Sequence, residues 1–355
     1  MLKTPAWAAP SATQPIEPFA IERREPGPHE VLIDIRYCGV CHSDIHMARD
    51  EWGGGNFPMV PGHEIVGDVV KVGDKVEKYA VGDTVGVGCF VDSCRHCEAC
   101  KDGEEQFCSN GMSVTYGGFE RTDGKLDKSR PTFGGYSTRI TVDENYVLRV
   151  PGSIPLERAA PLLCAGITTY SPLRRFNVKS GDKVAVVGLG GLGHMGVKLA
   201  KAMGAHVTVL SHSPGKHDSA LELGADDFVV TREEDAFEKN AGRFDFILDT
   251  VSAGHDYNAY LGLLRRGGTM VLVGLPEPQA LAAGSLILGR KQLTGSLIGG
   301  IAETQEMLDF CAEHGVASDV EVIAMDQINE AYERMIRGDV RYRFVIDIES
   351  LRKAG

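Results

Sequence analysis

The sequence predicts two domains, a small and irregular β domain in the first half and a parallel α/β sheet in the second. Three observations predict this arrangement. A chain of 355 residues is too long for one ordinary hydrophobic core. Up to about residue 150, short strand-like segments alternate with Gly-rich turns. From Pro151 onward, apolar strand-like segments alternate with helical stretches, which is typical of a parallel sheet.

Composition and charge exclude several classes of protein. With 43% hydrophobic and 24% charged residues the chain is typical of a globular protein, and its net charge of -12 argues against nucleic acid or an anionic membrane as a partner. No window offers the roughly 18 apolar residues of a membrane span, and the first residues lack the basic and apolar regions of a secretory signal. We therefore expect a cytoplasmic protein whose nine cysteines are metal ligands or free thiols.

Strand signals dominate the first domain. Residues 31–37 alternate well enough for a half-buried strand, and further β signals follow at residues 64–72 and 84–87. Two Val-Gly-Asp turns separate these segments. Residues 110–135 are polar and Gly-rich, which predicts a long surface loop, and strand-like alternation returns at residues 136–150.

A first candidate metal site lies in residues 38–64, where Cys41 is expected just beyond one strand and His63 at the start of the next. Cysteine thiolate and neutral imidazole are the donors that zinc prefers. Two donors do not complete a site, so this interpretation requires a third donor from elsewhere in the chain. Without it, a buried core cysteine and a structural histidine explain the same residues.

Four closely spaced cysteines form the strongest local motif. Their spacing is C-x2-C-x2-C-x7-C, and they are Cys94, Cys97, Cys100 and Cys108. Four thiolates complete a tetrahedral zinc site and leave no open position, so the motif predicts a structural zinc that orders a surface lobe at about residues 89–112. An iron–sulfur cluster is the competing interpretation, and a redox-active CxxC pair, which needs only two cysteines, is a third.

A dinucleotide site is predicted in the second domain. An apolar strand at residues 183–187 leads directly into the G-x-G-x-x-G spacing of Gly188, Gly190 and Gly193, and helical character follows at residues 195–203. The first glycine permits the tight turn, the second lets the backbone approach a pyrophosphate, and the third allows the helix to pack on the strand. The anion then lies at the helix N-terminus. A Gly-rich turn without a ligand is the alternative.

The end of the next strand, at residues 206–210, indicates which dinucleotide binds. An NAD site usually places Asp or Glu here, to bind the ribose 2′-hydroxyl. This segment has no carboxylate and carries instead Ser211, His212, Ser213 and Lys216. Small hydroxyls and a lysine suit a 2′-phosphate, so we expect NADP(H); a permissive NAD site is the alternative.

The remaining elements continue the α/β pattern. A helix is expected at residues 156–163, with Cys164 just beyond it. Strands are expected at residues 244–250, 269–274 and 341–348, and amphipathic helices at residues 304–314 and 326–337. The apolar residues 286–299 are interpreted as an edge strand that pairs across a subunit interface, or as an ordinary internal strand.

Taken in order, these motifs resemble the zinc-dependent medium-chain alcohol dehydrogenases, in particular the cinnamyl-alcohol-dehydrogenase-like branch. The resemblance covers nearly the whole chain, from about residue 30 to residue 347. It rests on the four-cysteine lobe and on the motifs CGVCHSD, VPGHEIVG, PLLCAGIT, VVGLGGLGHM, SHSPGK and RYRFVID. Together, in this order, the motifs are specific to the family.

The resemblance implies an α/β Rossmann domain, with a parallel doubly wound sheet, inserted in a GroES-like, mainly β catalytic domain. Residues 1–151 and 295–355 would form the catalytic domain, and residues 152–294 the NADP-binding domain. The resemblance also implies a homodimer, although some relatives are tetramers.

The resemblance further implies a catalytic zinc held by Cys41, His63 and Cys164, with the fourth position left for water or substrate. An open site of two cysteines and one histidine is the known arrangement of alcohol dehydrogenase. Glu64 matches a residue that approaches the metal during ligand exchange. Asp44 matches a carboxylate that orients the zinc-bound imidazole.

Other positions match the family's relay, pocket and cofactor residues. Ser43 and His46 would pass the alcohol proton outward together with the cofactor ribose, with His46 outermost. Trp52 and Phe90 match positions that line the substrate pocket, where aromatic walls suit an aryl or medium-length aliphatic aldehyde. The residues implied in cofactor binding are His42, Thr168, Gly188, Gly190, Gly191, Leu192, Gly193, Ser211, His212, Ser213, Lys216, Val273 and Arg343, for which Arg341 is a nearby alternative.

The implied function is the zinc- and NADP(H)-dependent interconversion of primary alcohols and aldehydes by hydride transfer, with aromatic, cinnamyl-type or medium-chain aliphatic substrates and aldehyde reduction expected. A zinc-free quinone reductase of the same superfamily is one alternative, but it would lack the metal ligands. An NADP-binding redox-sensing or structural protein is another, but it needs no open metal position. A polyol dehydrogenase of the family usually lacks the four-cysteine lobe or has an acidic residue after the second strand.

Overall fold

The computed structural model describes residues 1–353, which form two compact units. The first unit is Met1–Cys164 together with the chain from Gly299 onward, and the second is Ala165–Ile298. The chain therefore leaves the first unit once and returns to it, as an inserted domain requires. Within residues 1–353, no helix is both long enough and apolar enough to cross a membrane.

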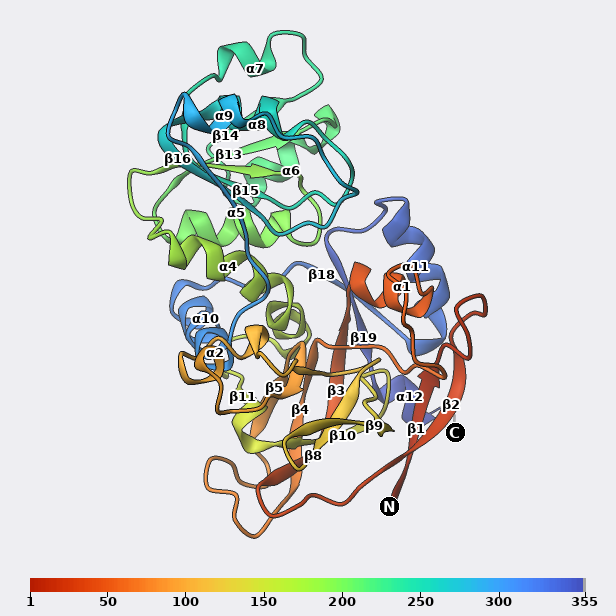
Figure 1. The fold of residues 1–355 in the computed structure, drawn as a ribbon. Helices are drawn as coiled ribbons and strands as arrows, with labels where there is room; N and C mark the ends of the chain where they lie inside the picture. The colour runs from red at the N-terminus through yellow and green to blue at the C-terminus, as the bar shows by residue number, and fades with distance from the viewer. Residues whose placement is uncertain (354–355) are drawn as a thin grey trace. The chain divides into compact units, whose positions relative to one another are not determined.

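The first unit is mainly β. Its elements are β1 (Leu2–Ala8), β2 (Glu17–Arg23), β3 (Glu30–Val40), α1 (His42–Ala48), β4 (Ile65–Val72), β5 (Thr84–Val87), β6 (Phe90–Asp92), α2 (Glu98–Lys101), β7 (Ser113–Val114), β8 (Phe119–Thr122), β9 (Lys125–Pro131), β10 (Arg139–Asp143), β11 (Leu148–Arg149), α3 (Leu156–Ala159), α10 (Ile301–His314), β18 (Val320–Ile323), α11 (Ile328–Ile336), β19 (Arg343–Asp347) and α12 (Glu349–Lys353). The central sheet has the order β11-β5-β4-β3-β19-β18, with β10 also paired to β3 (Figure 1).

β3 is the strand around which this sheet is built. Its apolar residues Val31, Ile33 and Ile35 are fully buried, and each buried aliphatic side chain contributes about 1.5–3 kcal/mol through removal of its surface from water. β3 pairs antiparallel with β4, β10 and β19. The pairing with β19 sets Phe344 opposite Val40, so the end of the chain is held in the sheet of the first unit.

The boundary between the two units differs from the expected one. Residues 156–163 form α3 and a 3₁₀ turn at Ala160–Leu163, and both pack against β3 and β4. The change of unit therefore falls after Cys164, where residue 151 was expected, and again after Ile298, where residue 294 was expected. Cys164 is for this reason a residue of the first unit.

The surface loop expected at residues 110–135 is instead partly a hairpin. β8 and β9 pair antiparallel, with Thr122 opposite Lys125 and a two-residue connection between them. Asp123 and Gly124 have φ values of 50° and 75°, which is the left-handed backbone that a tight hairpin turn requires and that Asp-Gly favours. The strands escaped prediction because they carry polar residues without apolar alternation.

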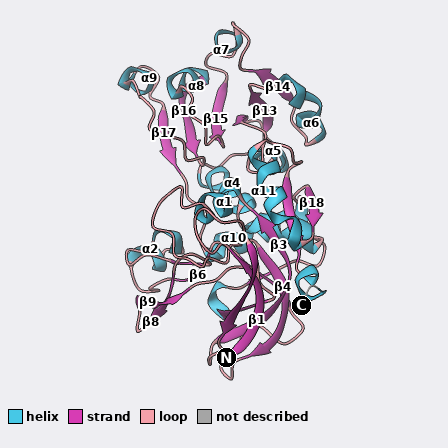
Figure 2. Cartoon of the chain, turned by 90° about the vertical axis from the view of Figure 1, so that its right-hand side faces the viewer, coloured by secondary structure: helices cyan, strands magenta, loops and turns pink. Residues whose placement is uncertain are grey.

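The second unit is a parallel α/β sheet. Its elements are α4 (Ala165–Arg175), β12 (Lys183–Val187), α5 (Gly193–Ala202), β13 (His206–Ser211), α6 (His217–Glu222), β14 (Asp227–Val230), α7 (Ala236–Lys239), β15 (Phe244–Asp249), α8 (Tyr257–Leu263), β16 (Leu264–Leu272), α9 (Ala283–Ile287) and β17 (Gln292–Gly295). The strand order is β14-β13-β12-β15-β16-β17, and every pair is parallel (Figure 2). This is the strand order of a Rossmann sheet, and it confirms the predicted fold class.

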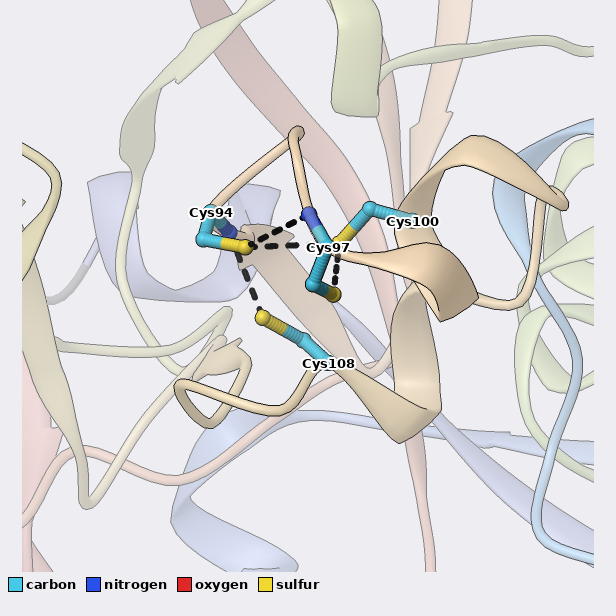
Figure 3. A group of neighbouring side chains, drawn as sticks. All are labelled: Cys94, Cys97, Cys100 and Cys108. Carbon is cyan, nitrogen blue, oxygen red and sulfur yellow. Dashed lines mark hydrogen bonds between the residues drawn. The ribbon is translucent and has the colours of Figure 1, made fainter.

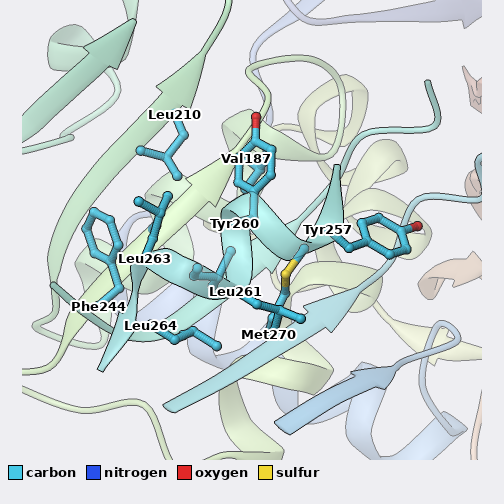
Figure 4. Close-up of a cluster of buried hydrophobic side chains, with 11 residues drawn as sticks. Val187, Leu210, Phe244, Tyr257, Tyr260, Leu261, Leu263, Leu264 and Met270 are labelled. Atoms are coloured by element: carbon cyan, nitrogen blue, oxygen red, sulfur yellow. The ribbon is translucent and has the colours of Figure 1, made fainter. Parts of the chain in front are cut away.

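The core of the second unit lies where α8 packs on the sheet. Leu261 of α8, Phe244 of β15 and Met270 of β16 are fully buried in one cluster (Figure 4). The fully buried Ile247 of β15 belongs to the same cluster. The segment expected as an edge strand at residues 286–299 contains the end of α9 followed by β17, which is an edge strand of the sheet. The α9 residue Ile287 and the following Leu288 are exposed, at 74% and 92%.

Candidate active site and metal centres

Strand register brings the first candidate site together. β3 ends at Val40, and Cys41 follows as the N-terminal cap of α1. The Gly39 N–H donates to the Glu64 carbonyl at 2.9 Å, which holds His63 and Glu64 beside the end of β3. A Cβ atom on Gly39 would lie 1.9 Å from Glu64 Oε2, so only glycine fits this close approach.

The Cys164 thiol reaches the same place from a distant segment. The preceding Leu163 packs closely on the end of β5. The closeness is visible at Gly86 and Gly88, where an added Cβ atom would lie only 3.0 and 3.1 Å from atoms of Leu163. Cys164 Sγ consequently lies 3.9 Å from Cys41 Sγ. One donor atom from each of four buried residues lies within 4.8 Å of the others, namely Cys41, His63, Glu64 and Cys164.

The donor set fits a zinc ion. A Zn–S bond of about 2.3 Å in tetrahedral geometry separates two sulfurs by about 3.8 Å, close to the 3.9 Å between Cys41 and Cys164. A hydrogen bond from Cys164 lowers the pKa of the Cys41 thiol well below its usual value, although burial opposes this. A lowered pKa favours the thiolate, which is the form that binds metal.

Asp44 fixes the orientation of the His63 ring. Asp44 is fully buried on α1, and its Oδ1 lies 3.1 Å from His63 Nδ1. The same carboxylate accepts hydrogen bonds from the backbone N–H of Cys41 at 2.8 Å and of Gly62 at 3.1 Å. With Nδ1 held in this way, Nε2 is the ring nitrogen left for a metal.

Glu64 forms a buried ion pair with Arg343. Burial raises the pKa of Glu64 to about 7, although Arg343 opposes this. Within residues 1–353, Glu64 Oε2 and Arg343 Nε are buried and have no hydrogen-bond partner. Arg343 was predicted to contact a cofactor phosphate, and that contact stays a prediction.

The predicted relay residues lie along α1. Ser43 Oγ is 3.7 Å from Cys41 Sγ. His46 Nδ1 lies 2.5 Å from Glu51 Oε2, and its ring stacks on Trp52 with centroids 5.0 Å apart. The order Ser43 then His46 thus leads from the metal donors toward a partly exposed imidazole. His42, assigned to the cofactor, is exposed on the same helix.

The two predicted pocket residues have different surroundings. Trp52 is 49% exposed beside His46, so its indole is accessible to a ligand. Phe90 is only 3% exposed, and its ring packs edge-on against Tyr146 with centroids 5.9 Å apart. This arrangement gives Phe90 a place in the core of the first unit, and its pocket role stays a prediction.

Sequence reasoning missed Tyr116 and the position of Cys89. Tyr116 is buried, and its ring stacks on His63 at 5.7 Å and 26°. Burial, and then the nearby Asp44, raise the pKa of Tyr116 well above its usual value. Cys89 Sγ lies 3.7 Å from the Leu163 carbonyl, next to Cys164. Tyr116 lies in a Gly-rich stretch that carries no metal-binding motif. The one signal in the sequence was that an aromatic residue stands next to two glycines.

The four-cysteine lobe forms a second, closed donor set. Figure 3 shows the sulfurs turned toward a common centre, all within 4.8 Å of one another. Cys94 Sγ lies 3.9 Å and Cys97 Sγ 3.4 Å from Cys100 Sγ, near the separation of about 3.8 Å in a tetrahedral zinc site. The Asn110 side chain and the His96 backbone lower the pKa of Cys94 to about 5. Cys108 Sγ accepts from Cys94 N–H at 3.3 Å.

In the second unit, the three motif glycines have the geometry that a pyrophosphate requires. Gly188 has a φ of 85°, a left-handed backbone conformation that favours glycine at this tight turn. A Cβ on Gly193 would lie 2.1 Å from the Gly188 carbonyl, which explains the close packing of α5. A Cβ on Gly190 would meet nothing within 4 Å, so the backbone there is open to a ligand. Gly191 and Leu192 complete the turn, and Leu192 is the N-terminal cap of α5.

The predicted 2′-phosphate residues lie beside this turn. β13 ends at Ser211, and Ser213 N–H donates to Ser211 Oγ at 3.2 Å. Lys216 Nζ donates to the carbonyl of Leu189, within the glycine turn, at 3.0 Å. His212 is exposed on the same segment. The lysine charge therefore stands next to the turn, as the NADP hypothesis requires.

The last two residues assigned to the cofactor lie on other elements of the second unit. Thr168 is buried within α4. Val273 follows β16, and its N–H donates to the Asp249 carbonyl at 2.9 Å. Nothing in these two environments tests their predicted contact with nicotinamide.

A metal-dependent, dinucleotide-dependent oxidoreductase is the class of protein that these features define. A closed four-cysteine set lies in one unit together with a second set of two cysteines, one histidine and Glu64, whose carboxylate is ion-paired with Arg343. A glycine turn with open backbone at Gly190 lies at the end of a strand of the Rossmann sheet in the other unit.

Comparison with known proteins identifies the family. Residues 27–152 match the alcohol dehydrogenase GroES-like domain, and residues 191–313 match the zinc-binding dehydrogenase domain. The chain is 60% identical to NADP-dependent alcohol dehydrogenase C 1 of Mycolicibacterium smegmatis, over 98% of each chain. It is 56% identical to the aldehyde reductase YahK of Escherichia coli, over 99% of each. The structure of the Sorghum bicolor cinnamyl alcohol dehydrogenase SbCAD4 is 47% identical, with a TM-score of 0.93 over 98% of each chain.

The chain belongs to the zinc-binding alcohol dehydrogenase family, and the family resemblance inferred from its motifs is confirmed.

Proposed function

We propose that the protein is a zinc- and NADP(H)-dependent alcohol dehydrogenase that acts mainly as a reductase of aromatic, cinnamyl-type or medium-chain aliphatic aldehydes. The observation that carries this proposal is the convergence of Cys41, His63 and Cys164 in one buried donor set. Relatives named as an NADP-dependent alcohol dehydrogenase and an aldehyde reductase support the cofactor and the substrate class.

The residues of the first unit hold and orient the reacting group. Cys41, His63 and Cys164 would hold the metal, and the remaining position would face the substrate oxygen. A zinc ion bound there lowers the pKa of an alcohol hydroxyl and polarises an aldehyde carbonyl. Asp44 keeps the His63 ring in the orientation that binding needs. Burial of all the donors keeps water away from the reacting atoms.

Ser43 and His46 are the proposed path for the proton. Ser43 Oγ lies 3.7 Å from Sγ of the proposed metal donor Cys41, so its hydroxyl would be near a substrate oxygen held at the metal. His46 is partly exposed and paired with Glu51, so its imidazole lies where it can pass a proton to solvent. In aldehyde reduction, this path supplies the proton that the product alcohol retains.

The second unit would bind the dinucleotide. The open backbone at Gly190 and the N-terminus of α5 suit a pyrophosphate. Ser211, Ser213 and Lys216 suit a 2′-phosphate, because hydroxyl and ammonium groups donate to its oxygens. NADPH held by these residues would supply the hydride for reduction of the carbonyl carbon.

We further propose a homodimer and a cytoplasmic location. β17 is an edge strand of its sheet, and the exposed apolar side chains Leu275, Ile287 and Leu288 lie near it in the sequence. Burial of such side chains by a second copy is favourable. None of the nine cysteines, all of which lie within residues 1–353, forms a disulfide, which fits a reducing compartment.

A kinetic panel tests the proposed function. Benzaldehyde, cinnamaldehyde and aliphatic aldehydes are each reduced with NADPH and with NADH, before and after dialysis against a chelator. We expect turnover with NADPH that is lost on removal of metal and restored by zinc. Turnover indifferent to complete metal removal would favour a zinc-free quinone reductase.

Lys216→Glu tests the cofactor assignment. We expect the KM for NADPH to rise far more than the KM for NADH, because the new carboxylate repels the 2′-phosphate. Lys183→Glu, an exposed change at the opposite end of the sheet at the start of β12, is the matched control and should alter neither value. Equal effects of Lys216→Glu on both cofactors would contradict a 2′-phosphate site.

A further inference from the structure

A cavity of about 420 Å³ in the first unit is lined by none of the metal donors themselves, although its lining residues Asp92 and Arg95 flank Cys94 of the four-cysteine set. It is bounded by the end of β2, the turn before β3, the segment from β6 to Arg95, the β8–β9 hairpin and β10. Its lining is rich in guanidinium groups, which come from Arg23, Arg24, Arg95, Arg121 and Arg130. We call it the arginine cavity.

Three of these arginines are paired with carboxylates. Arg24 pairs with Glu30 and lies 3.5 Å from Glu120. Arg130 lies 2.6 Å from Glu120. Arg95 is paired with two further carboxylates of the lining, at 2.9 and 3.0 Å, those of Asp92 and Asp143. All four acidic groups of the lining are therefore engaged with arginines.

Arg23 and Arg121 lack such a partner within residues 1–353. Arg23 donates only to backbone carbonyls and to a serine hydroxyl, at 2.8 to 3.1 Å. Burial lowers the pKa of Arg23 to about 9, so the guanidinium is still charged at neutral pH. Arg121 donates to the carbonyls of Asn110, Gly111 and Gly124. The three paired arginines and the four carboxylates sum to -1, so with Arg23 and Arg121 the arginines and carboxylates of the lining carry a net charge of +1, in a chain whose net charge is -12.

Donor groups without acceptors line the same cavity. Among the described residues, Ser113 Oγ, Arg24 Nε and Arg121 Nε are buried and have no hydrogen-bond partner. Ser113 is fully buried. Leaving a buried donor unpaired is unfavourable. Ser113 and Arg121 line the same cavity, whereas Arg24 Nε lies 3.5 Å from a Glu120 carboxylate oxygen.

We propose that the arginine cavity binds a small oxyanion, a phosphate or a small carboxylate. Such an ion offers several acceptor oxygens, which matches the guanidinium and hydroxyl donors of Arg23, Arg121 and Ser113. The cavity volume accommodates a small ion with ordered water. Because Arg121 belongs to the β8–β9 hairpin and Arg23 to β2, the bound ion would fasten the hairpin to the rest of the unit.

Isothermal titration with inorganic phosphate tests this proposal. The full-length zinc enzyme is first saturated with NADPH, so that the cofactor phosphate site at Lys216 is already filled. We expect one additional phosphate to bind at millimolar concentration, and malonate in a parallel titration distinguishes a carboxylate ligand from phosphate. Binding of either ion supports the site, whereas binding of neither overturns it.

Two variants locate any binding that is seen. Arg121→Gln and Ser113→Ala should each weaken it about tenfold, the effect of losing one charge-assisted hydrogen bond. Ser113→Ala should not destabilise the anion-free protein, because its hydroxyl has no partner there. The matched control is Arg36→Gln, which removes an exposed arginine paired with Asp68 outside the cavity. Binding that both cavity variants leave unchanged would overturn the proposal.

Discussion

Asp44→Asn is the sharpest single change for the open metal site. Asp44 is buried and accepts from Cys41 N–H at 2.8 Å, Gly62 N–H at 3.1 Å and, on the same oxygen, His63 at 3.1 Å. Asparagine keeps one oxygen acceptor but places an NH2 group against one of the donors. We therefore expect the metal-free protein to lose about 1–3 kcal/mol of unfolding free energy, the cost of a buried unpaired donor.

The same change should weaken zinc binding at this site. A carboxylate that orients a metal-binding histidine typically contributes about ten- to a hundredfold in affinity. The assay is competition for zinc with a chromophoric chelator. It should show that one zinc ion is bound more weakly than in the wild-type protein and that the other is bound with unchanged affinity, since Asp44 does not contact the four-cysteine set. Circular dichroism and chemical denaturation measure the stability loss separately.

Glu144→Gln is the matched control. Glu144 is also buried and accepts from the backbone N–H groups of Glu77 and Lys78 at 2.8 and 2.9 Å, but it lies outside both donor sets. It should lower stability without altering zinc affinity. If Asp44→Asn left zinc affinity at its wild-type value, or if the control lowered it equally, the orienting role assigned to Asp44 would be refuted.

Three further predictions follow from the structure. Cys97→Ser should remove one zinc and make residues 94–108 sensitive to protease, because α2 has no buried residue of its own; metal analysis and mass spectrometry of the fragments check this. Tyr116→Ala should cost about 3–5 kcal/mol of stability and weaken zinc binding. Tyr116→Phe should keep the stack on His63 and therefore the zinc affinity. Chemical denaturation measures the stability of each variant, and zinc competition measures its affinity for the metal. Burial acts to raise the pKa of Glu144, but hydrogen bonds from Lys78 and Glu77 outweigh it and hold the folded-state pKa below 4.5. The stabilisation by Glu144 is therefore full above the unfolded-state pKa and is lost as pH falls through the folded value, so denaturation of Glu144→Gln and wild type should converge in acid.

Local patterns predicted most of the sheet framework. β5 was expected at residues 84–87 and occupies Thr84–Val87, and β15 was expected at residues 244–250 and occupies Phe244–Asp249. Buried strands and glycine turns are encoded within a few neighbouring residues, so single-sequence patterns reveal them. The four cysteines were found for the same reason, since their whole donor set spans 15 residues.

Contacts between distant segments were not predictable from residue patterns. Cys164 lies 123 residues from Cys41 in the sequence, and Arg343 lies 279 residues from Glu64. Only family resemblance assigned Cys164 to the metal site, and it assigned Arg343 to a phosphate without anticipating the buried pair with Glu64. The β8–β9 hairpin was missed because its strands carry polar residues and lack apolar alternation. A tight Asp-Gly turn and cross-strand ion pairs, such as Arg130 with Glu120, stabilise it instead.

The zinc content and activity of Cys164→Ser show whether Cys164 helps to hold a catalytic metal. We expect two zinc ions per chain in the wild-type protein, from its two donor sets. Cys164→Ser, purified in parallel, should lose the ion of the site at Cys41 and His63, keep that of the four-cysteine lobe and reduce no aldehyde. A variant that kept both ions and full turnover would contradict this role of Cys164.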